Sequence, residues 1–174
     1  LQFTKAQALS PVGQCRTFDK DANGFVPGEG CGLFLLKPLE KAMEDGDQVL
    51  SVIEGSSINN DGFTMGLTPP NPLSQEAVIK NALKTAGRTQ EDIGMIEAHG
   101  TGTKIGDPIE LQALNTVFKE WTNKTGVCAV GSVKSNIGHL LSAAGSSGMA
   151  KVILSLKHGV IPPSLFCDTP NPRF

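Results

Sequence analysis

The sequence predicts an α/β fold with a largely parallel sheet. Short apolar runs that end in polar, glycine-rich turns alternate with longer helical segments, and this alternation is typical of strands joined by helices. Size agrees with this prediction, because 174 residues, 39% of them hydrophobic and 18% charged, suit one soluble globular unit. In such sheets the chemistry usually lies where strands end.

The first third of the chain is predicted to contain a loop, two strands and a short helix. Residues 10–30 are rich in Gly, Pro and Asp, which favours irregular loop. The continuous apolar run at 31–36 predicts a buried strand, and residues 49–58 resemble a second one. Between them, Pro38 is expected to open a short helix that closes at Gly46.

The middle of the chain is predicted to form a loop and then a helix. Residues 59–72 contain Asn-Asn-Asp-Gly and three prolines, a composition typical of loops. Ser74 is the expected N-cap of a helix that runs from Gln75 to about Ala86, and Gly87 is its expected stop.

The second half alternates strands and helices. Short strands are predicted at 95–98 and 128–131. A helix capped by Asp-Pro is expected over 107–120, and a long helix over 140–158. The long helix begins with small residues, which is typical of close packing in a core despite the poor helix propensity of glycine.

Composition narrows the function classes. The net charge of -2 gives no support for binding to nucleic acid or to a membrane surface. No apolar run approaches the ~20 residues that span a bilayer, and the start lacks a signal peptide. The first residue is not Met, so the N-terminus is expected to be a cut. The scattered cysteines suit free thiols in a reducing, cytoplasmic compartment rather than disulfides or a metal site: Cys15, Cys31, Cys128 and Cys167.

A glycine-rich turn, EAHGTGT at 97–103, follows the strand predicted at 95–98. Such a turn could cradle a phosphate. However, no Gly-Lys-Ser/Thr follows as in a Walker loop, and Gly106 falls one residue late for the dinucleotide pattern Gly-x-Gly-x-x-Gly. Nucleotide binding is therefore not the expected function of this turn.

A second motif, KSNIGH at 134–139, stands before the long helix. The positive end of the helix dipole and the charge of Lys134 would both favour the neutral form of the His139 imidazole, which then donates one N–H. Taken alone, a histidine in this position is more often a structural residue.

Residues 19–24, DKDANG, copy the first half of a calcium-binding loop. That motif needs five residues between its glycine and its bidentate glutamate, but only four separate Gly24 from Glu29. Calcium binding is therefore not expected.

Taken together, these stretches resemble one family. EAHGTGT at 97–103 and KSNIGHLLSAAG at 134–145 are similar to the two histidine motifs of β-ketoacyl synthases. Four further stretches agree in order and spacing: residues 8–32, 58–62, 106–110 and 161–172. The chain is identified as a member of this family, and its SNIGH and NNDG sequences look more like type I polyketide synthases than stand-alone fatty acid enzymes.

The resemblance implies a thiolase-like fold, in which two similar α/β halves stack as α-β-α-β-α layers. Residues 1–174 would form the second half and the end of the first, as one partial ketosynthase domain without a separate second domain. The implied activity is that of an acyltransferase in polyketide or fatty acid biosynthesis. A cysteine takes an acyl chain from a carrier protein, and a malonyl-type unit then loses carbon dioxide and attacks that thioester.

By the same resemblance, three residues would be catalytic. His99 and His139 would donate hydrogen bonds to the thioester oxygen of the extender as it becomes an enolate. Lys134 would organise the site electrostatically. In fatty acid enzymes this lysine pairs with a glutamate on the following helix, but Gly148 stands at the matching position, so that partner is expected to be missing.

The resemblance also implies how substrates reach the site. Thr101 and Thr103 would contact the phosphopantetheine arm, and Asn136 would be a third substrate-binding residue. No cofactor and no metal are expected to bind directly, because acyl and malonyl units arrive on carrier-protein phosphopantetheine. The expected partners are the acyl carrier protein, a second copy in a homodimer and other synthase domains.

The family's nucleophile lies in a Thr-Ala-Cys-Ser-Ser segment, which this sequence does not contain. The isolated chain is therefore expected to be inactive, and two alternatives to an elongating synthase stay open. One is a non-elongating domain that only passes acyl chains, although such domains often lose the histidine that is present here as His99. The other is a structural half that a separate cysteine-bearing chain completes.

Overall fold

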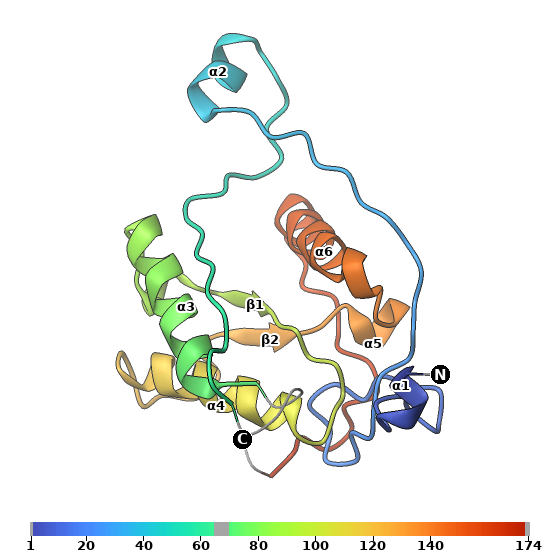
Figure 1. Ribbon diagram of the computed structural model, residues 1–174. Coiled ribbons are helices and arrows are strands. Elements are labelled where there is room, and N and C mark those ends of the chain that lie inside the picture. Colours follow the sequence, from blue (N-terminus) through green and yellow to red (C-terminus); the bar gives the residue numbers. More distant parts are fainter. Residues whose placement is uncertain (1, 65–69, 173–174) are drawn as a thin grey trace.

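The computed structural model describes residues 2–64 and 70–172 (Figure 1). At its centre lie two parallel strands, β1 (Met95–Glu97) and β2 (Ala129–Gly131). They pair in register, with Met95 opposite Ala129 and Glu97 opposite Gly131. The two strands predicted in the second half are thus confirmed, and so is their parallel pairing.

Alternation along the strands decides which helix covers which face of the sheet. Ile96 and Val130 line the same hollow as Leu114 of α4 (Gly106–Lys119), which lies on one side of the sheet. Glu97 points to the other face, toward Gly148 of α6 (Ala144–His158). The centre therefore has three layers, helix, sheet and helix.

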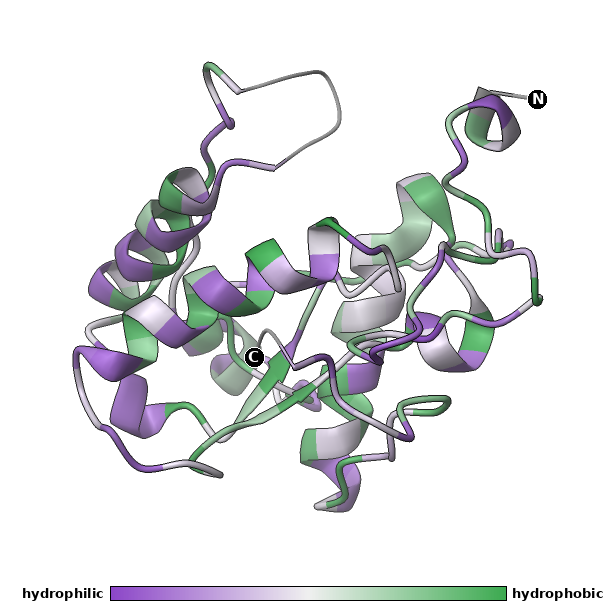
Figure 2. Cartoon of the chain, turned by 90° about the horizontal axis from the view of Figure 1, so that it is seen from below, coloured by the Kyte–Doolittle hydropathy of each residue, from purple (hydrophilic) through white to green (hydrophobic). Residues whose placement is uncertain are grey.

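The helix α3 (Pro72–Ala86) packs beside α4 (Figure 1). Figure 2 shows that the helices carry both hydrophilic and hydrophobic residues, whereas the two central strands are mostly hydrophobic. The remaining helical segments are short: α1 (Gln2–Lys5), α2 (Leu39–Glu44), α5 (Lys134–Ile137) and the 3-10 turns Gln90–Asp92 and Leu141–Ala143. None of the helices over residues 2–64 and 70–172 is long and apolar enough to cross a membrane.

Both strands predicted in the first third are wrong in this structure. Residues 31–36 and 49–58 form two extended arms that lead to and from α2 (Figure 1). Most of their side chains are exposed, with Leu33 and Leu35 at 99% and 98%, although the backbone at Gly32 and Gly55 lies close to Ser146 and Ala86. An apolar run becomes a strand only when a neighbour takes its backbone hydrogen bonds, and no described strand lies beside either arm.

The predicted helix starts differ from the observed ones where a better cap was available. α3 begins at Pro72, three residues before the predicted start, because Asn71 accepts the Leu73 N–H at 3.0 Å and proline suits the first helical position. The stop at Gly87 is confirmed, with a φ of 63°. The loop predicted over 59–72 is confirmed at 59–64 and 70–71, and its residues 65–69 lie outside the described part of the chain.

The long helix predicted over 140–158 is shorter than expected. α6 starts at Ala144, after the 3-10 turn that contains Leu141, whose φ is 51°. His139 therefore does not stand at the N-terminus of α6, and the expected dipole contribution to its protonation is wrong. α4 also begins one residue before Asp107, and its first N–H is capped by the Thr103 hydroxyl at 3.2 Å.

Candidate active site

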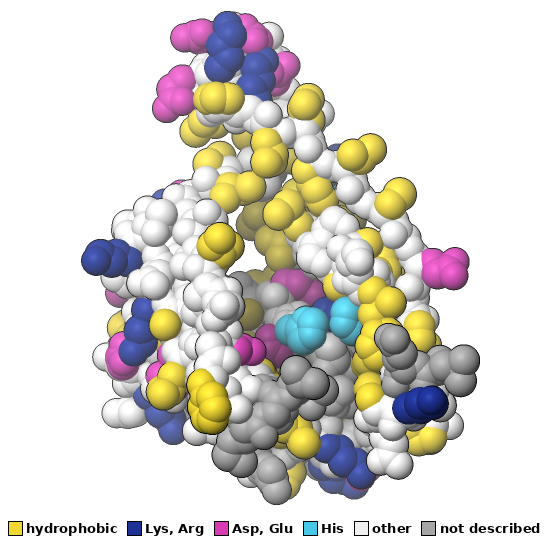
Figure 3. Space-filling model, in the orientation of Figure 1, with side chains coloured by type: hydrophobic (Ala, Val, Ile, Leu, Met, Phe, Trp, Pro, Cys, Tyr) yellow, Lys and Arg dark blue, Asp and Glu magenta, His cyan; other side chains and the backbone are white. Residues whose placement is uncertain are grey.

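Two histidines from different segments meet near the carboxyl ends of β1 and β2. His99 comes two residues after β1, and His139 follows α5. Their ring centroids are 5.4 Å apart and their planes meet at 84°, an edge-to-face arrangement. Figure 3 shows histidine side chains gathered on the floor of a central hollow, with Asp or Glu and Lys or Arg side chains close behind them.

The backbone of His139 is fixed by residues that the sequence places in a plain loop. Its N–H donates to the Val26 carbonyl at 2.7 Å, and its own carbonyl accepts the Gly28 N–H at 2.9 Å. Gly138 has a φ of 78°, and a Cβ there would lie 2.8 Å from the Val26 oxygen. Residues 26–28 therefore form a parallel β-bridge with His139 and fix its backbone. The sequence gives no sign of this contact, because the two segments meet only in the folded protein.

The ring of His139 is also oriented. Its Nδ1 accepts the backbone N–H of Leu141 at 3.0 Å, so the proton of the neutral ring sits on Nε2. The Phe25 ring packs against it edge-on, with centroids 5.0 Å apart. The imidazole is thus held as a single-donor group with a defined tautomer.

His99 is held by the acidic residue Glu110 on the first turns of α4. One carboxylate oxygen of Glu110 accepts the His99 N–H at 2.6 Å, and the other accepts the Gly100 N–H at 2.8 Å. From the opposite side, the Ser132 hydroxyl donates to the His99 carbonyl at 3.3 Å. Glu110 belongs to the GDPIE stretch, so an acid soon after a strand-end histidine was the available signal.

A second acid of the same stretch, Asp107, holds the rest of the turn. Its carboxylate accepts the N–H groups of Gly102, Thr103 and Phe18, at 3.0, 3.3 and 2.8 Å. Burial raises the pKa of Asp107 to about 6, although the three backbone donors favour the charged form. The glycine-rich turn is thus bound by two carboxylates, which leaves little room for a phosphate in the same place.

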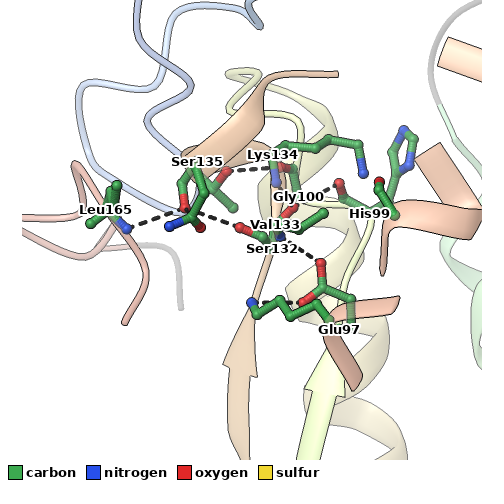
Figure 4. A network of polar contacts seen from close by, with 12 residues as sticks. Glu97, His99, Gly100, Ser132, Val133, Lys134, Ser135 and Leu165 are labelled. Atoms are coloured by element: carbon green, nitrogen blue, oxygen red, sulfur yellow. Dashed lines mark hydrogen bonds and ion pairs between the residues drawn. The ribbon is translucent and has the colours of Figure 1, made fainter. Parts of the chain in front are cut away.

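Lys134 is buried, 4% exposed, and supplies the positive charge of the site (Figure 4). Burial lowers the pKa of its ammonium, while the carboxylates of Glu110 and Glu97 act in the opposite direction. Gly148 stands where the fatty acid enzymes have their glutamate, so that partner is absent, as expected from the sequence. Glu110 and Glu97 act on the charge of Lys134 from other elements.

The surroundings keep both imidazoles neutral. Burial, then the Lys134 charge and then the neighbouring His99, lower the pKa of His139 to about 4. His99 lies closer to the surface, yet the protein atoms around it and the Lys134 charge lower its pKa below 6.5 as well. Near neutral pH the site therefore presents two uncharged N–H donors beside a cation.

The three residues expected to bind substrate differ in their exposure and in their hydrogen-bond partners. Thr101 is buried, 8% exposed, and its hydroxyl lies 3.2 Å from that of Thr103. Thr103 in turn accepts the Gly106 N–H. Asn136 is exposed, and its side-chain oxygen accepts from the Ser135 hydroxyl at 3.2 Å.

The four cysteines are free thiols without the features of a nucleophile. Burial raises the pKa of the Cys15 thiol, whose sulfur accepts the Val26 N–H at 3.1 Å. Burial raises the pKa of the Cys128 and Cys167 thiols as well. Cys31 is exposed on an extended arm. A reactive cysteine needs the opposite shift, so Cys15, Cys128 and Cys167 are not activated thiols.

Comparison with known protein families shows which family carries these two histidine motifs. Residues 50–168 match the family described as "Beta-ketoacyl synthase, C-terminal domain", and residues 1–42 match "Beta-ketoacyl synthase, N-terminal domain". The chain belongs to the β-ketoacyl synthase family. The boundary between the two matches agrees with the predicted second half plus the end of the first half.

Relatives of this ketosynthase chain are polyketide synthases. It is 51% identical over 174 residues to "Polyketide synthase PksL" of Bacillus subtilis, covering all of this chain and 4% of that protein. It is 46% identical over 172 residues to "Reducing polyketide synthase rdc5" of Metacordyceps chlamydosporia, covering 99% of this chain and 7% of that one. The chain thus spans a small part of the relatives it matches.

Solved ketosynthases share the fold. The ketosynthase from module 6 of the bacillaene synthase of Bacillus subtilis superimposes with a TM-score of 0.97 at 51% identity, over 99% of this chain and 31% of that one. The oxazolomycin ketosynthase domain of Streptomyces albus gives 0.93 at 43% identity, over 99% and 30%. These matches confirm the predicted thiolase-like α/β fold, of which the described residues display three layers.

Proposed function

We propose that this ketosynthase chain is a portion of a β-ketoacyl synthase that condenses an acyl thioester with a malonyl-type extender in polyketide or fatty acid biosynthesis. The observation that carries the proposal is the pairing of His99 and His139, 5.4 Å apart and both kept neutral beside Lys134. The polyketide branch is favoured because the relatives are polyketide synthases.

The proposed chemistry follows from two neutral donors. As the bond between the extender's α-carbon and its carboxylate breaks, carbon dioxide leaves and the electron pair moves toward the thioester oxygen. Nε2–H of His139 and an N–H of His99 stabilise that oxygen. A neutral imidazole donates a hydrogen bond without readily protonating the carbanion, which would end the reaction. Removing one donor of this kind costs roughly 10²–10³ in rate.

The second half of the reaction needs an acyl group on a cysteine. The enolate carbon attacks the acyl thioester carbon, the new carbon–carbon bond forms, and the cysteine thiolate leaves. Burial raises the pKa of the Cys15, Cys128 and Cys167 thiols, and Cys31 lies exposed on an extended arm. We therefore assign the nucleophile to another part of the synthase, and the isolated chain is proposed to be inactive.

In this proposal, residues 1–174 form one partial ketosynthase domain. Carrier-protein phosphopantetheine would deliver both substrates, with Thr101, Thr103 and Asn136 beside its arm. The partners are the acyl carrier protein, a second ketosynthase copy and other domains of the synthase. The free thiols support a cytoplasmic location.

The proposal is tested by separating two half-reactions in the complete synthase polypeptide that contains this chain. His99→Ala and His139→Ala should each lower carbon dioxide release from malonyl carrier protein by roughly 10²-fold or more, while acyl transfer to the cysteine continues. His158→Ala is the control, because His158 is an exposed residue in the last turn of α6. Equal loss of both half-reactions would show that the histidines are structural. A wild-type synthase that transfers acyl groups but releases no carbon dioxide would favour the acyl-passing alternative.

A further inference from the structure

A buried ion pair lies beneath the two histidines and has no part in the chemistry proposed above. The Glu97 carboxylate, at the end of β1, lies 2.8 Å from the Lys151 ammonium of α6. The two side chains are 8% and 6% exposed. The other oxygen of Glu97 accepts the Val133 N–H at 2.5 Å (Figure 4).

Two glycines make the space that this pair occupies. A Cβ at Gly148 of α6 would lie 3.1 Å from Cγ of Glu97, and a Cβ at Gly131 of β2 would lie 3.2 Å from Nζ of Lys151. Gly145, one turn earlier on α6, has nothing within 4 Å of its Cβ position. The close approach at Gly148 is therefore not shared by every glycine of this helix.

Burying two charges does not by itself stabilise a fold, because desolvation offsets much of their attraction. What the pair does in this structure is connect the two motifs. Val133 directly precedes Lys134, and Ser132 on its other side bonds both the His99 carbonyl and the Lys134 N–H. Glu97 thus fastens the start of the second histidine motif to the strand that leads into the first.

We propose that Glu97 is a positioning residue: its carboxylate, housed against Gly148 and balanced by Lys151, holds the segment that carries Lys134 and His139 in register with His99. Lys151 has a second effect. It offsets the charge of Glu97, so that Lys134 keeps more of its positive field at the imidazoles. The effect on activity rests on the proposed function, whereas the effect on structure does not.

The first test compares three variants in the complete synthase. Glu97→Ala should lower kcat for carbon dioxide release by on the order of 10²-fold, as misplaced catalytic groups do, with KM unchanged because Glu97 touches no substrate. The double variant E97Q/K151M keeps an oxygen for the Val133 N–H and leaves no unpaired charge, so it should recover most of the lost rate. E97Q alone leaves Lys151 buried without a counter-charge, so its rate of carbon dioxide release should lie between those of Glu97→Ala and the double variant. Wild-type rates in Glu97→Ala, or a double variant as slow as Glu97→Ala, would overturn the proposal.

The second test uses the two glycines of α6 as a matched pair. Gly148→Ala should push Glu97 out of place, increase deuterium uptake in the peptide spanning 132–139 and slow carbon dioxide release. Gly145→Ala should change neither, because its methyl group meets open space. Equal deuterium uptake in the two variants would overturn the proposal. This readout needs no activity, so a synthase that releases no carbon dioxide would refute the proposed function while leaving the role of Glu97 open to the exchange measurement.

Discussion

The backbone N–H of Leu141 donates to Nδ1 of His139 at 3.0 Å, and this bond decides which end of the imidazole can act. The ring cannot accept a proton on Nδ1 without losing that bond, and its second nitrogen already carries one. Burial, the charge of Lys134 and the neighbouring His99 lower the pKa of His139 to about 4, so the ring stays neutral with its proton on Nε2.

A histidine with a lowered pKa gives a definite pH dependence. The unfolded chain takes up a proton near pH 6.5, whereas folded His139 does so only near pH 4. Between those values the unfolded state binds more protons at His139, so the contribution of His139 to the free energy of unfolding should decrease as the pH falls through this window. Asp107, whose pKa is raised to about 6, contributes in the opposite direction, so the His139 contribution is read as the difference between wild type and His139→Ala. Carbon dioxide release should likewise persist below pH 6 and fail toward pH 4. A ¹⁵N-histidine spectrum showing the Nε2–H tautomer at pH 5.5 would agree, and an imidazolium at that pH would contradict the assignment.

Gly138→Ala should displace His139. Gly138 has a φ of 78° and a ψ of −175°, a region that is essentially restricted to glycine and costs other residues about 1–3 kcal/mol. Here the added Cβ would also lie 2.8 Å from the Val26 oxygen. Gly126→Ala is the matched control, because its φ is 71° and nothing lies within 4 Å. Urea unfolding should show a larger loss of stability for Gly138→Ala. Only that variant should also lose carbon dioxide release.

Glu110→Gln should weaken the support of His99. Glutamine has one side-chain oxygen, so it cannot accept both the His99 and the Gly100 N–H. Losing one such bond at this part-buried site costs about 0.5–1.5 kcal/mol of stability, and kcat for decarboxylation should decrease with little change in KM. Glu120→Gln provides the comparison, since Glu120 forms an exposed pair with Lys80, and such pairs contribute about 0–1 kcal/mol. Indistinguishable effects from the two substitutions would argue against a role for Glu110.

The isolated 174-residue chain should not become acylated by an acyl thioester, nor release carbon dioxide from malonyl carrier protein. Burial raises the pKa of the Cys15, Cys128 and Cys167 thiols, which disfavours the reactive thiolate. Intact-protein mass spectrometry checks the first statement directly. An added acyl mass that maps to any of its cysteines would place the nucleophile inside this chain.

Local patterns predicted the helices, because apolar spacing and capping residues nearby in sequence mark the helix over Gly106–Lys119 and the stop at Gly87. The apolar runs before His99 and Ser132 became strands because each has the other as a partner. The runs at 31–36 and 49–58 have the same composition as buried strands, but their state depends on a neighbouring strand that the sequence pattern cannot supply.

In the candidate site, too, residues within a motif could be predicted from the sequence, whereas contacts between distant segments could not. Its histidines and Lys134 stand in motifs, so the sequence could point to them. Their supports could not be found in this way, because Glu97 reaches Lys151 and Gly148 across layers of the fold. The spacing of the motifs correctly indicated that Lys134 lacks the glutamate of the fatty acid enzymes, but it gave no sign that Glu97 of a strand and Glu110 of another helix would act on the charge of Lys134.

The two extended arms have a consequence for handling the chain. Salt bridges from Lys37 to Asp45 and Asp47 close the tip around α2, and the two arms that diverge from it expose apolar side chains and have no strand partner among the described residues (Figure 1). Such unpaired segments template hydrogen bonding with other chains. The concentration at which the isolated chain stays monomeric should therefore be governed by intermolecular β-pairing at these arms, far more than by its small net charge.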